Sequence, residues 1–133
     1  MNSRYLPIAR RAANRCEYCH APENMFNLTF EVEHVQPQSK GGSNDESNLA
    51  LTCRSCNLFK SNFVDGSDDL TQRTVSLYNP RADSWAEHFE FDLQTRHVIG
   101  RTDVGRATVK RLRMNSPKQL ACRLMWIKLG LFP

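Results

Sequence analysis

Two cysteine pairs with the same spacing constrain this chain most. Cys16 and Cys19 form the first pair, and Cys53 and Cys56 form the second. Each Cys-x2-Cys pair can supply two sulfurs to a tetrahedral Zn²⁺, and four thiolates leave no open position for a substrate. The spacing therefore predicts a structural Zn(Cys)4 site, with a substantial element inserted between the pairs. A disulfide-bonded set and four unrelated buried thiols are the alternatives.

Size and composition favour one cytoplasmic domain. The chain has 133 residues, of which 40% are hydrophobic and 24% are charged, enough for one domain with a modest core. No apolar run approaches the roughly 20 residues that cross a bilayer, and the first residues lack the apolar core of a secretory signal. In the cytoplasm paired cysteines hold metal more often than they form disulfides. The formal charge of +4 falls to about +2 with a Zn(Cys)4 site, so net charge alone does not indicate a nucleic-acid partner.

The segment around the cysteines predicts a ββα unit. From Phe26 to Glu33 apolar and polar residues alternate with period two, which is typical of a half-buried strand. Residues 36–48 have the composition of a loop, residues 49–52 are predicted as a second strand, and residues 57–63 as two helical turns. The strand, loop, strand and helix would surround the metal.

The flanking segments complete a single α+β domain over residues 1–133. We expect an N-terminal basic helix within residues 1–15, a metal-binding core at 16–63 and a strand and helix extension at 64–133. Within the extension the patterns predict a polar turn at 65–69, a strand at 75–78, a hairpin pairing 89–93 with 97–100, and a helix at 102–114.

A last helix is predicted to begin at Ser116-Pro117, a favourable cap and first turn. Its apolar residues at helical spacing predict the buried side of this helix: Leu120, Leu124, Ile127 and Leu131. Cys122, alone on this helix, is expected to be buried as a small hydrophobe.

An acid, a histidine and an amide remain after the cysteines are assigned. An imidazole can take a proton from water at neutral pH, so His34 is the candidate general base. Glu33 and Asn57 offer hard oxygen ligands for Mg²⁺ or Mn²⁺. Successive strand residues point to opposite faces, so Glu33 and His34 serve one site only where the strand ends or bends. A satisfied histidine at a strand end is the structural alternative for His34.

The order of these residues resembles the motif of the HNH endonuclease family. Residues 33–42 (Glu-His-Val-Gln-Pro-Gln-Ser-Lys-Gly-Gly) and 48–60 (Asn-Leu-Ala-Leu-Thr-Cys-Arg-Ser-Cys-Asn-Leu-Phe-Lys) contain the resemblance, which is strong over 16–60. The tail is similar to a bacterial HNH subgroup common in cyanobacteria. The resemblance implies a ββα-metal (His-Me finger) core in an endonuclease or nickase that hydrolyses DNA with a divalent metal.

The resemblance also implies roles for individual residues. His34 matches the general base, and Glu33 and Asn57 match the ligands of the catalytic metal. Asn48 matches the middle residue of the motif and is expected to pin the loop and orient His34. Glu33 stands where Asp or His is more usual, and Asn57 stands where the family motif has His. Fewer imidazoles favour Mg²⁺ or Mn²⁺ at the catalytic site.

Several cations are candidates for contacts to nucleic acid. Lys60 follows Asn57 on the helix, and Lys40 lies in a glycine-containing loop. Arg106, Lys110 and Arg113 share one helix face by spacing. A second cluster consists of Arg10, Arg11 and Arg15. Such cations would track phosphates without reading sequence, although solvated helix faces are the common alternative.

Other functions remain open at this point. The main alternative is a noncatalytic zinc-stabilised module that binds nucleic acid or protein, and a redox protein using Cys-x2-Cys is a third. One ββα-metal site cuts one strand, so double-strand cleavage would need a homodimer or sequential nicks. No module that reads bases is evident, which favours weak sequence preference or a targeting partner.

Overall fold

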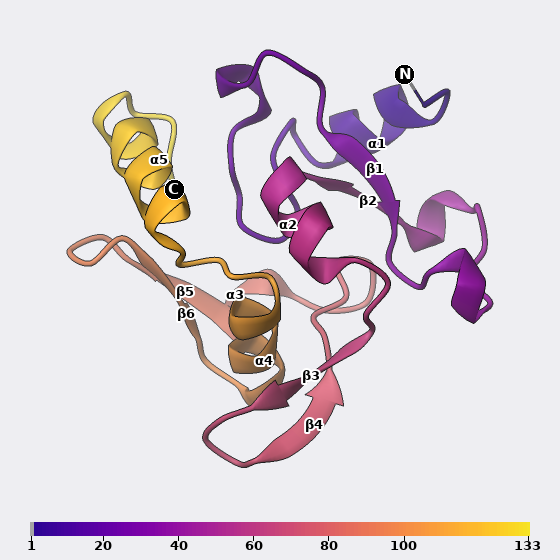
Figure 1. Ribbon diagram of the computed structural model, residues 1–133. Helices are drawn as coiled ribbons and strands as arrows, with labels where there is room; N and C mark the ends of the chain where they lie inside the picture. The colour runs from indigo at the N-terminus through magenta and orange to yellow at the C-terminus, as the bar shows by residue number, and fades with distance from the viewer. Residues whose placement is uncertain (1) are drawn as a thin grey trace.

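The computed structural model describes residues 2–133 as short helices and three two-stranded antiparallel sheets (Figure 1). In chain order the helices and strands are α1 (Tyr5–Arg11), β1 (Glu31–His34), β2 (Leu49–Thr52), α2 (Arg54–Lys60), β3 (Asp65–Asp68), β4 (Arg73–Ser76), α3 (Trp85–His88), β5 (Phe89–Asp92), β6 (His97–Gly100), α4 (Asp103–Arg111) and α5 (Pro117–Lys128). The predicted α+β class is confirmed. Within the described residues no helix is both long and apolar enough to span a membrane.

The predicted ββα unit is present as β1, β2 and α2. Strand β2 has the predicted bounds, and it pairs antiparallel with β1 so that Glu33 lies opposite Ala50. The first half of the other strand prediction is wrong, because β1 begins only at Glu31 and Leu28 is exposed. A 3₁₀ turn at Glu23–Met25 precedes it, and the Glu23 carboxylate accepts a hydrogen bond from the Phe30 backbone N–H at 2.6 Å. These local contacts bend the chain where alternation predicted an extended strand.

Helix α2 begins three residues earlier than predicted, inside the second cysteine pair. The Cys53 sulfur caps it by accepting the backbone N–H of Cys56 at 3.4 Å. The helix ends at Lys60, because Ser61 takes a positive φ of 50°. The cysteine pair is therefore the first turn of the helix that presents Asn57.

Two hairpins and the helices α3, α4 and α5 make up the extension. Strands β5 and β6 confirm the predicted hairpin, and α4 packs against both β3 and β6. The predicted polar turn at 65–69 is wrong, because residues 65–68 form β3 and pair with β4. Gly66 is buried against Leu77 and Ala107, and the buried carboxylate of Asp68 pairs with Arg106. Packing against α4 thus overrides the turn composition.

Helix α5 begins as predicted but buries a different side. The Ser116 hydroxyl accepts the N–H of Gln119, whereas the apolar residues predicted for the core are only partly buried. The buried side consists of Gln119, Arg123 and Trp126. Cys122 is exposed, so its predicted burial is wrong. Because apolar residues occupy several sides of this helix, periodicity alone did not select the side that packs.

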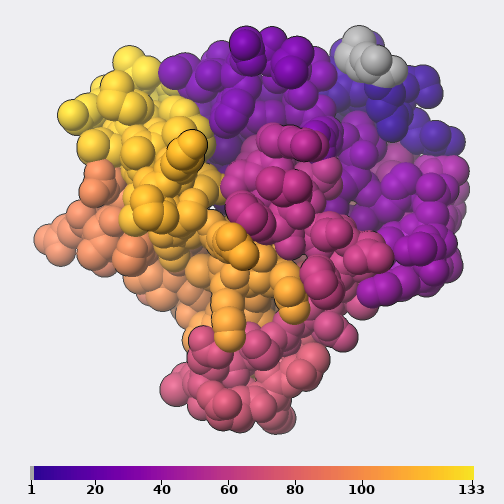
Figure 2. All heavy atoms as spheres, in the orientation of Figure 1, coloured from indigo at the N-terminus to yellow at the C-terminus, as the bar shows by residue number. Residues whose placement is uncertain are grey.

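The C-terminal segment packs against the N-terminal part of the chain. Trp126 lies 6.0 Å from Phe26 between ring centroids, and the Arg15 guanidinium donates to the Leu131 carbonyl at 2.7 Å. In Figure 2 the yellow C-terminal residues lie directly against the purple N-terminal third of the chain. The hydrophobic core therefore joins residues from both halves.

Candidate functional site

The four cysteines converge on one buried point. The sulfurs of Cys16, Cys19, Cys53 and Cys56 all lie within 4.8 Å of one another, and those of Cys19 and Cys53 are 3.7 Å apart. A tetrahedral Zn²⁺ with bonds of about 2.3 Å needs sulfurs about 3.8 Å apart. A disulfide needs about 2.05 Å, and all five cysteines of the chain are free thiols. The donor set therefore fits a zinc ion and does not support the disulfide alternative.

Two hydrogen bonds from Glu17 hold the two cysteine pairs together. Glu17, inside the first pair, donates its backbone N–H to the Leu51 carbonyl of β2 at 2.9 Å, and its side-chain carboxylate accepts the Leu51 N–H at 2.8 Å. Arg81 forms an ion pair with the same carboxylate. The first pair is thus fixed to the strand that leads into the second pair.

Arg123 of α5 brings a buried positive charge close to the cysteines. Its side chain is fully buried and donates to the backbone oxygens of Arg96 at 2.6 Å and Met114 at 2.7 Å. Burial lowers the pKa of Arg123, and the nearby charges of Cys19 and Cys56 oppose that shift. A zinc ion with four thiolates has a net charge of about −2, which this guanidinium would partly balance.

His34 lies at the end of β1 with a partly exposed ring. Its Nε2 atom is 2.7 Å from the side-chain oxygen of Asn44, which also accepts from Gln38 at 3.1 Å. An amide oxygen can only accept, so this contact places the ring proton on Nε2 and leaves a lone pair on Nδ1. The His34 ring is therefore hydrogen-bonded to Asn44. The motif had suggested Asn48 as the residue that orients it.

Asn48 pins the loop between β1 and β2 and makes no hydrogen bond to the His34 ring. Its side-chain oxygen accepts the Gln36 N–H at 2.9 Å, and its amide donates to the carbonyls of Gln36 at 3.0 Å and Ser43 at 2.8 Å. Gly42 fits under this clamp, since a Cβ there would lie 1.7 Å from the Gln36 carbonyl oxygen. Asn48 thus holds the loop that contains Asn44.

Glu33 points to the other face of β1 and is buried. One carboxylate oxygen accepts the Tyr18 hydroxyl at 2.5 Å, and the other lies 3.3 Å from Nζ of Lys60, which also donates to the Val35 carbonyl at 3.1 Å. Burial raises the pKa of Glu33 and outweighs the opposing attraction of Lys60. Burial also raises the pKa of Tyr18, with Glu33 adding to the shift. Both Glu33 oxygens therefore have partners inside the protein.

Asn57 faces a different acid of the same strand. Its side-chain amide contacts the carboxylate of Glu31, whose other oxygen pairs with Arg54 at 3.0 Å. Glu31 keeps 36% of its side chain exposed, whereas Glu33 keeps 5%. The structure therefore brings Asn57 together with Glu31, a residue that the motif did not single out. The strand period of two could have found it, because Glu31 and Glu33 share one face of β1.

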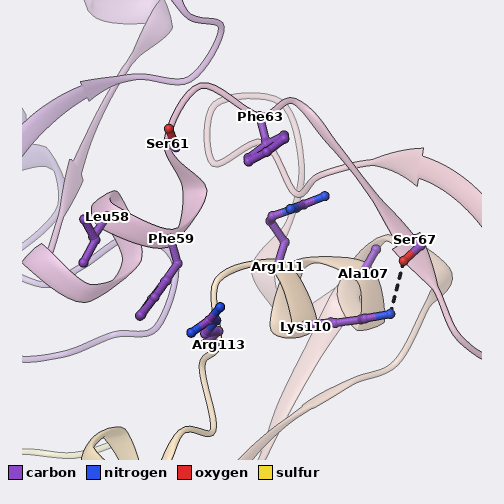
Figure 3. A pocket seen from close by; sticks show the side chains of 9 residues that line it. All are labelled: Leu58, Phe59, Ser61, Phe63, Ser67, Ala107, Lys110, Arg111 and Arg113. Carbon is purple, nitrogen blue, oxygen red and sulfur yellow. Dashed lines mark hydrogen bonds between the residues drawn. The ribbon is translucent and has the colours of Figure 1, made fainter.

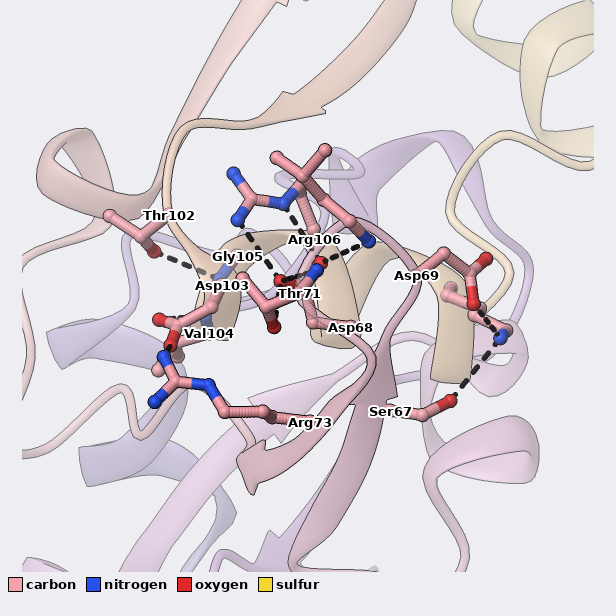
Figure 4. A network of polar contacts seen from close by, with 12 residues as sticks. Ser67, Asp68, Asp69, Thr71, Arg73, Thr102, Asp103, Val104, Gly105 and Arg106 are labelled. Atoms are coloured by element: carbon pink, nitrogen blue, oxygen red, sulfur yellow. Dashed lines mark hydrogen bonds and ion pairs between the residues drawn. The ribbon is translucent and has the colours of Figure 1, made fainter.

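The candidate phosphate contacts fall into two groups. Lys40 and Arg113 are exposed. Lys60 keeps only 2% of its side chain exposed, which argues against the predicted phosphate contact. Arg106 and Lys110 pair with acids of the β3–β4 hairpin. Figure 4 shows Arg106 directed at Asp68.

The Arg106 pair is the tighter of these two. Its guanidinium donates two bonds, at 2.9 and 3.0 Å, to the buried carboxylate of Asp68, and this pairing lowers the pKa of Asp68. Lys110 lies 2.6 Å from Asp69, an exposed pair. Arg106 therefore supports the fold, and the acids of the β3–β4 hairpin neutralise part of the predicted basic face of α4.

The N-terminal arginines are also mostly occupied. Arg11 donates to the carbonyls of Glu46 and Leu49, and Arg15 donates to those of His20 and Leu131. Arg10 is exposed. This second predicted cluster therefore serves mainly to join α1 to the β1–β2 loop and to the C-terminal segment.

The site combines four clustered cysteines that could hold a metal ion with a strand-end histidine and a short helix. This arrangement is that of a ββα protein. Residues 16–63 match the family model described as HNH endonuclease, which confirms the resemblance over this segment. No curated protein and no solved structure matches the chain.

Proposed function

We propose that this protein is an endonuclease or nickase that hydrolyses DNA phosphodiester bonds, with His34 as the general base. The main support is the His34 ring itself, which is partly exposed and fixed through Nε2 to Asn44 in the segment that matches the HNH family. The Nδ1 lone pair would take a proton from the attacking water. Asn48 acts as a positioning residue, because it holds the loop that contains Asn44.

A divalent cation, Mg²⁺ or Mn²⁺, belongs to this proposal as a requirement to be tested. The expected ligand pair, Glu33 and Asn57, does not form an open cation site as placed, because Glu33 is buried with Tyr18 and Lys60. No catalytic step is therefore derived through such an ion. Glu31 is the acid that faces Asn57 and remains partly exposed, so it is the first carboxylate that a cation beside Asn57 would meet.

Nicking of supercoiled plasmid with Mg²⁺ or Mn²⁺ tests the proposal. We expect His34→Ala to lose at least about 100-fold in rate, the range that a general base contributes. His97→Ala, at an exposed histidine of β6, is the matched control and should retain full activity. If wild type and His34→Ala were equally inert, or equally active, across divalent metals, the nuclease proposal would be wrong.

Two further variants separate the carboxylates of β1. If Glu31 meets the cation, Glu31→Gln raises the metal concentration needed for half-maximal nicking and leaves zinc content unchanged. If Glu33 leaves Lys60 and binds the cation, Glu33→Gln raises the metal concentration for half-maximal nicking instead. Circular dichroism of both variants identifies a loss of activity that comes from misfolding, which is a concern mainly for the buried Glu33.

One observation favours the alternative, a noncatalytic module that binds nucleic acid or protein. The Glu33–Lys60 pair occupies the carboxylate that the family resemblance assigns to the metal. A noncatalytic module predicts that wild-type protein binds zinc and folds but leaves plasmid uncut with every divalent metal tested. Measured nicking that depends on His34 would exclude it.

A further inference from the structure

A groove between α2 and α4 contains cations that the β3–β4 acids do not neutralise. This α2–α4 groove has a volume of about 530 Å³, within the range of about 300–1,000 Å³ that is common for ligand sites. Figure 3 shows its walls, with the end of α2 and the following loop on one side and the end of α4 on the other. The residues that matter for the argument are Phe59, Ser61, Phe63, Ser67, Arg111 and Arg113.

Two arginines in the groove are fixed by aromatic rings instead of by acids. The guanidinium carbon of Arg111 lies 3.9 Å from the centre of the Phe63 ring, and that of Arg113 lies 4.4 Å from the centre of the Phe59 ring. Among the described residues, neither arginine takes part in a salt bridge or donates a side-chain hydrogen bond. Arg106 and Lys110 of the same helix, in contrast, pair with Asp68 and Asp69.

This arrangement is chemically selective. A phenyl ring lies against each guanidinium in a cation–π contact, and the N–H groups of both guanidiniums remain free to donate. Two parallel N–H bonds from a guanidinium match the oxygens of a phosphate or a carboxylate. The hydroxyls of Ser61 and Ser67 add neutral donors to the lining. The groove therefore suits a ligand with several anionic oxygens spaced along it.

The position of the groove favours a nucleic-acid strand over a small anion. Ser61 lies one helical turn after Asn57, and its backbone N–H donates to the Asn57 carbonyl at 3.0 Å. A helix with its side chains is about 10 Å wide, so a strand along the groove passes within about that distance of Asn57. An extended polyanion can reach both places, whereas an isolated phosphate cannot.

We propose that the α2–α4 groove binds the phosphodiester backbone of the nucleic-acid strand next to the bond that is cut, through Arg111 and Arg113. This inference rests on the proposed nuclease function and adds to it a fixed path for the strand. Arg111 was not among the cations that the sequence suggested, because helical spacing selected Arg106, Lys110 and Arg113 instead. Arg111 differs from Arg106 and Lys110 because its guanidinium contacts the Phe63 ring and not an acid.

The test measures binding without cleavage. In a His34→Ala background, the affinity for fluorescently labelled single-stranded and duplex DNA is measured by anisotropy at several salt concentrations. Arg111→Ala/Arg113→Ala should lose at least about tenfold in affinity for one or both probes. The slope of log affinity against log salt should become shallower by about 1–2, because two phosphate contacts are lost.

Two matched variants make the result specific. Lys118→Ala/Lys128→Ala removes the same charge from exposed positions of α5 and should change affinity less than threefold. Arg111→Lys/Arg113→Lys keeps the charge but not the planar fork, so it should restore the salt slope and only part of the affinity. Zinc content and circular dichroism should match the parent protein in each case.

The outcomes also separate this inference from the proposed function. If the alanine pair binds both probes like the parent protein, or loses no more than the α5 pair, the groove does not bind the strand, even when wild type nicks DNA. If groove variants lose binding while wild type never nicks, the groove proposal survives as a binding site, and the nuclease proposal fails.

Discussion

The two halves of the molecule use their chemically distinctive residues differently. In residues 16–63, side chains far apart in sequence meet around shared centres: four cysteines at one point, and Tyr18, Glu33 and Lys60 at another. In residues 64–133, Arg106 and Lys110 pair with acids of the neighbouring hairpin. Regularly spaced cysteines in the first half therefore indicate a binding site. Regularly spaced cations in the second half mostly indicate how α4 packs against β3.

Cysteine substitutions should show the largest difference between the halves. Cys19→Ser should abolish stoichiometric zinc binding and unfold the N-terminal half, since structural zinc sites contribute about 10–16 kcal/mol to folding. Cys122→Ser, at the exposed cysteine of α5, should leave zinc content and the melting temperature unchanged. Metal analysis and thermal unfolding, with and without a chelator, measure both effects. If the two variants had the same zinc content and the same melting temperature, the proposed zinc site would be wrong.

Two lysines provide the next comparison. Lys60→Met leaves the Glu33 carboxylate buried without its partner and should lower the free energy of unfolding by about 3–5 kcal/mol. Lys110→Met breaks an exposed pair and should change it by less than about 0.5 kcal/mol. Urea denaturation measures both. The double variant Glu33→Gln/Lys60→Met should lose less than the sum of its single variants, and additive losses would show that the two groups do not interact.

Glycine substitutions sharpen the comparison at the level of the backbone. Gly42→Ala forces a Cβ against the Gln36 carbonyl, so we expect a loss of about 2–3 kcal/mol together with reduced nicking. Gly130 has a φ of 72° but open space around it, and Gly130→Ala should lose only about 1 kcal/mol, with nicking intact. A Gly42→Ala variant with wild-type stability would mean that the loop closes less tightly than the structure shows.

The smallest expected effect is a difference in acid stability. Arg106 lowers the pKa of Asp68 in the folded protein, so this pair stabilises the fold above the ordinary pKa of about 4 and is lost as the pH falls below it. Burial raises the pKa of Glu33, so its contribution has the opposite sign and decreases as the pH rises through and above its ordinary value. Asp68→Asn should flatten the acid side of the stability curve. An unchanged curve between pH 2 and pH 5 would contradict this assignment.

Local patterns predicted much of the first half, and the resemblance added its site. The clustering of the four cysteines and the bounds of β2 could be predicted, because the first follows from two matched pairs that can bind one metal and the second from a short apolar run between a loop and a cysteine pair. Asn44 could not be selected, since its importance depends on where the His34 ring points. For Glu31 the strand period of two was the available signal, and the structure adds its contact with Asn57.

The second half was harder to predict for a physical reason. Asp65-Gly-Ser-Asp has the composition of a turn, yet Asp68 is neutralised by Arg106, thirty-eight positions further along the chain. Arg123 likewise lies on the buried side of α5, which was expected to be exposed. Its guanidinium can be buried because it donates to the backbone oxygens of Arg96 and Met114. Periodicity treats both residues as polar and exposed, and only the long-range partners make their burial favourable.

The Asn48 clamp has a consequence for chain entropy. The connection between β1 and β2 is long for a hairpin, but Asn48 ties Gln36 and Ser43 to the start of β2. The hydrogen bonds of Asn48 divide this loop into two shorter loops. The entropic cost of closing a loop rises by about 0.6 kcal/mol for each doubling of its length. Much of the conformational freedom that His34 and its loop would lose on binding the proposed DNA substrate is therefore already lost when the protein folds.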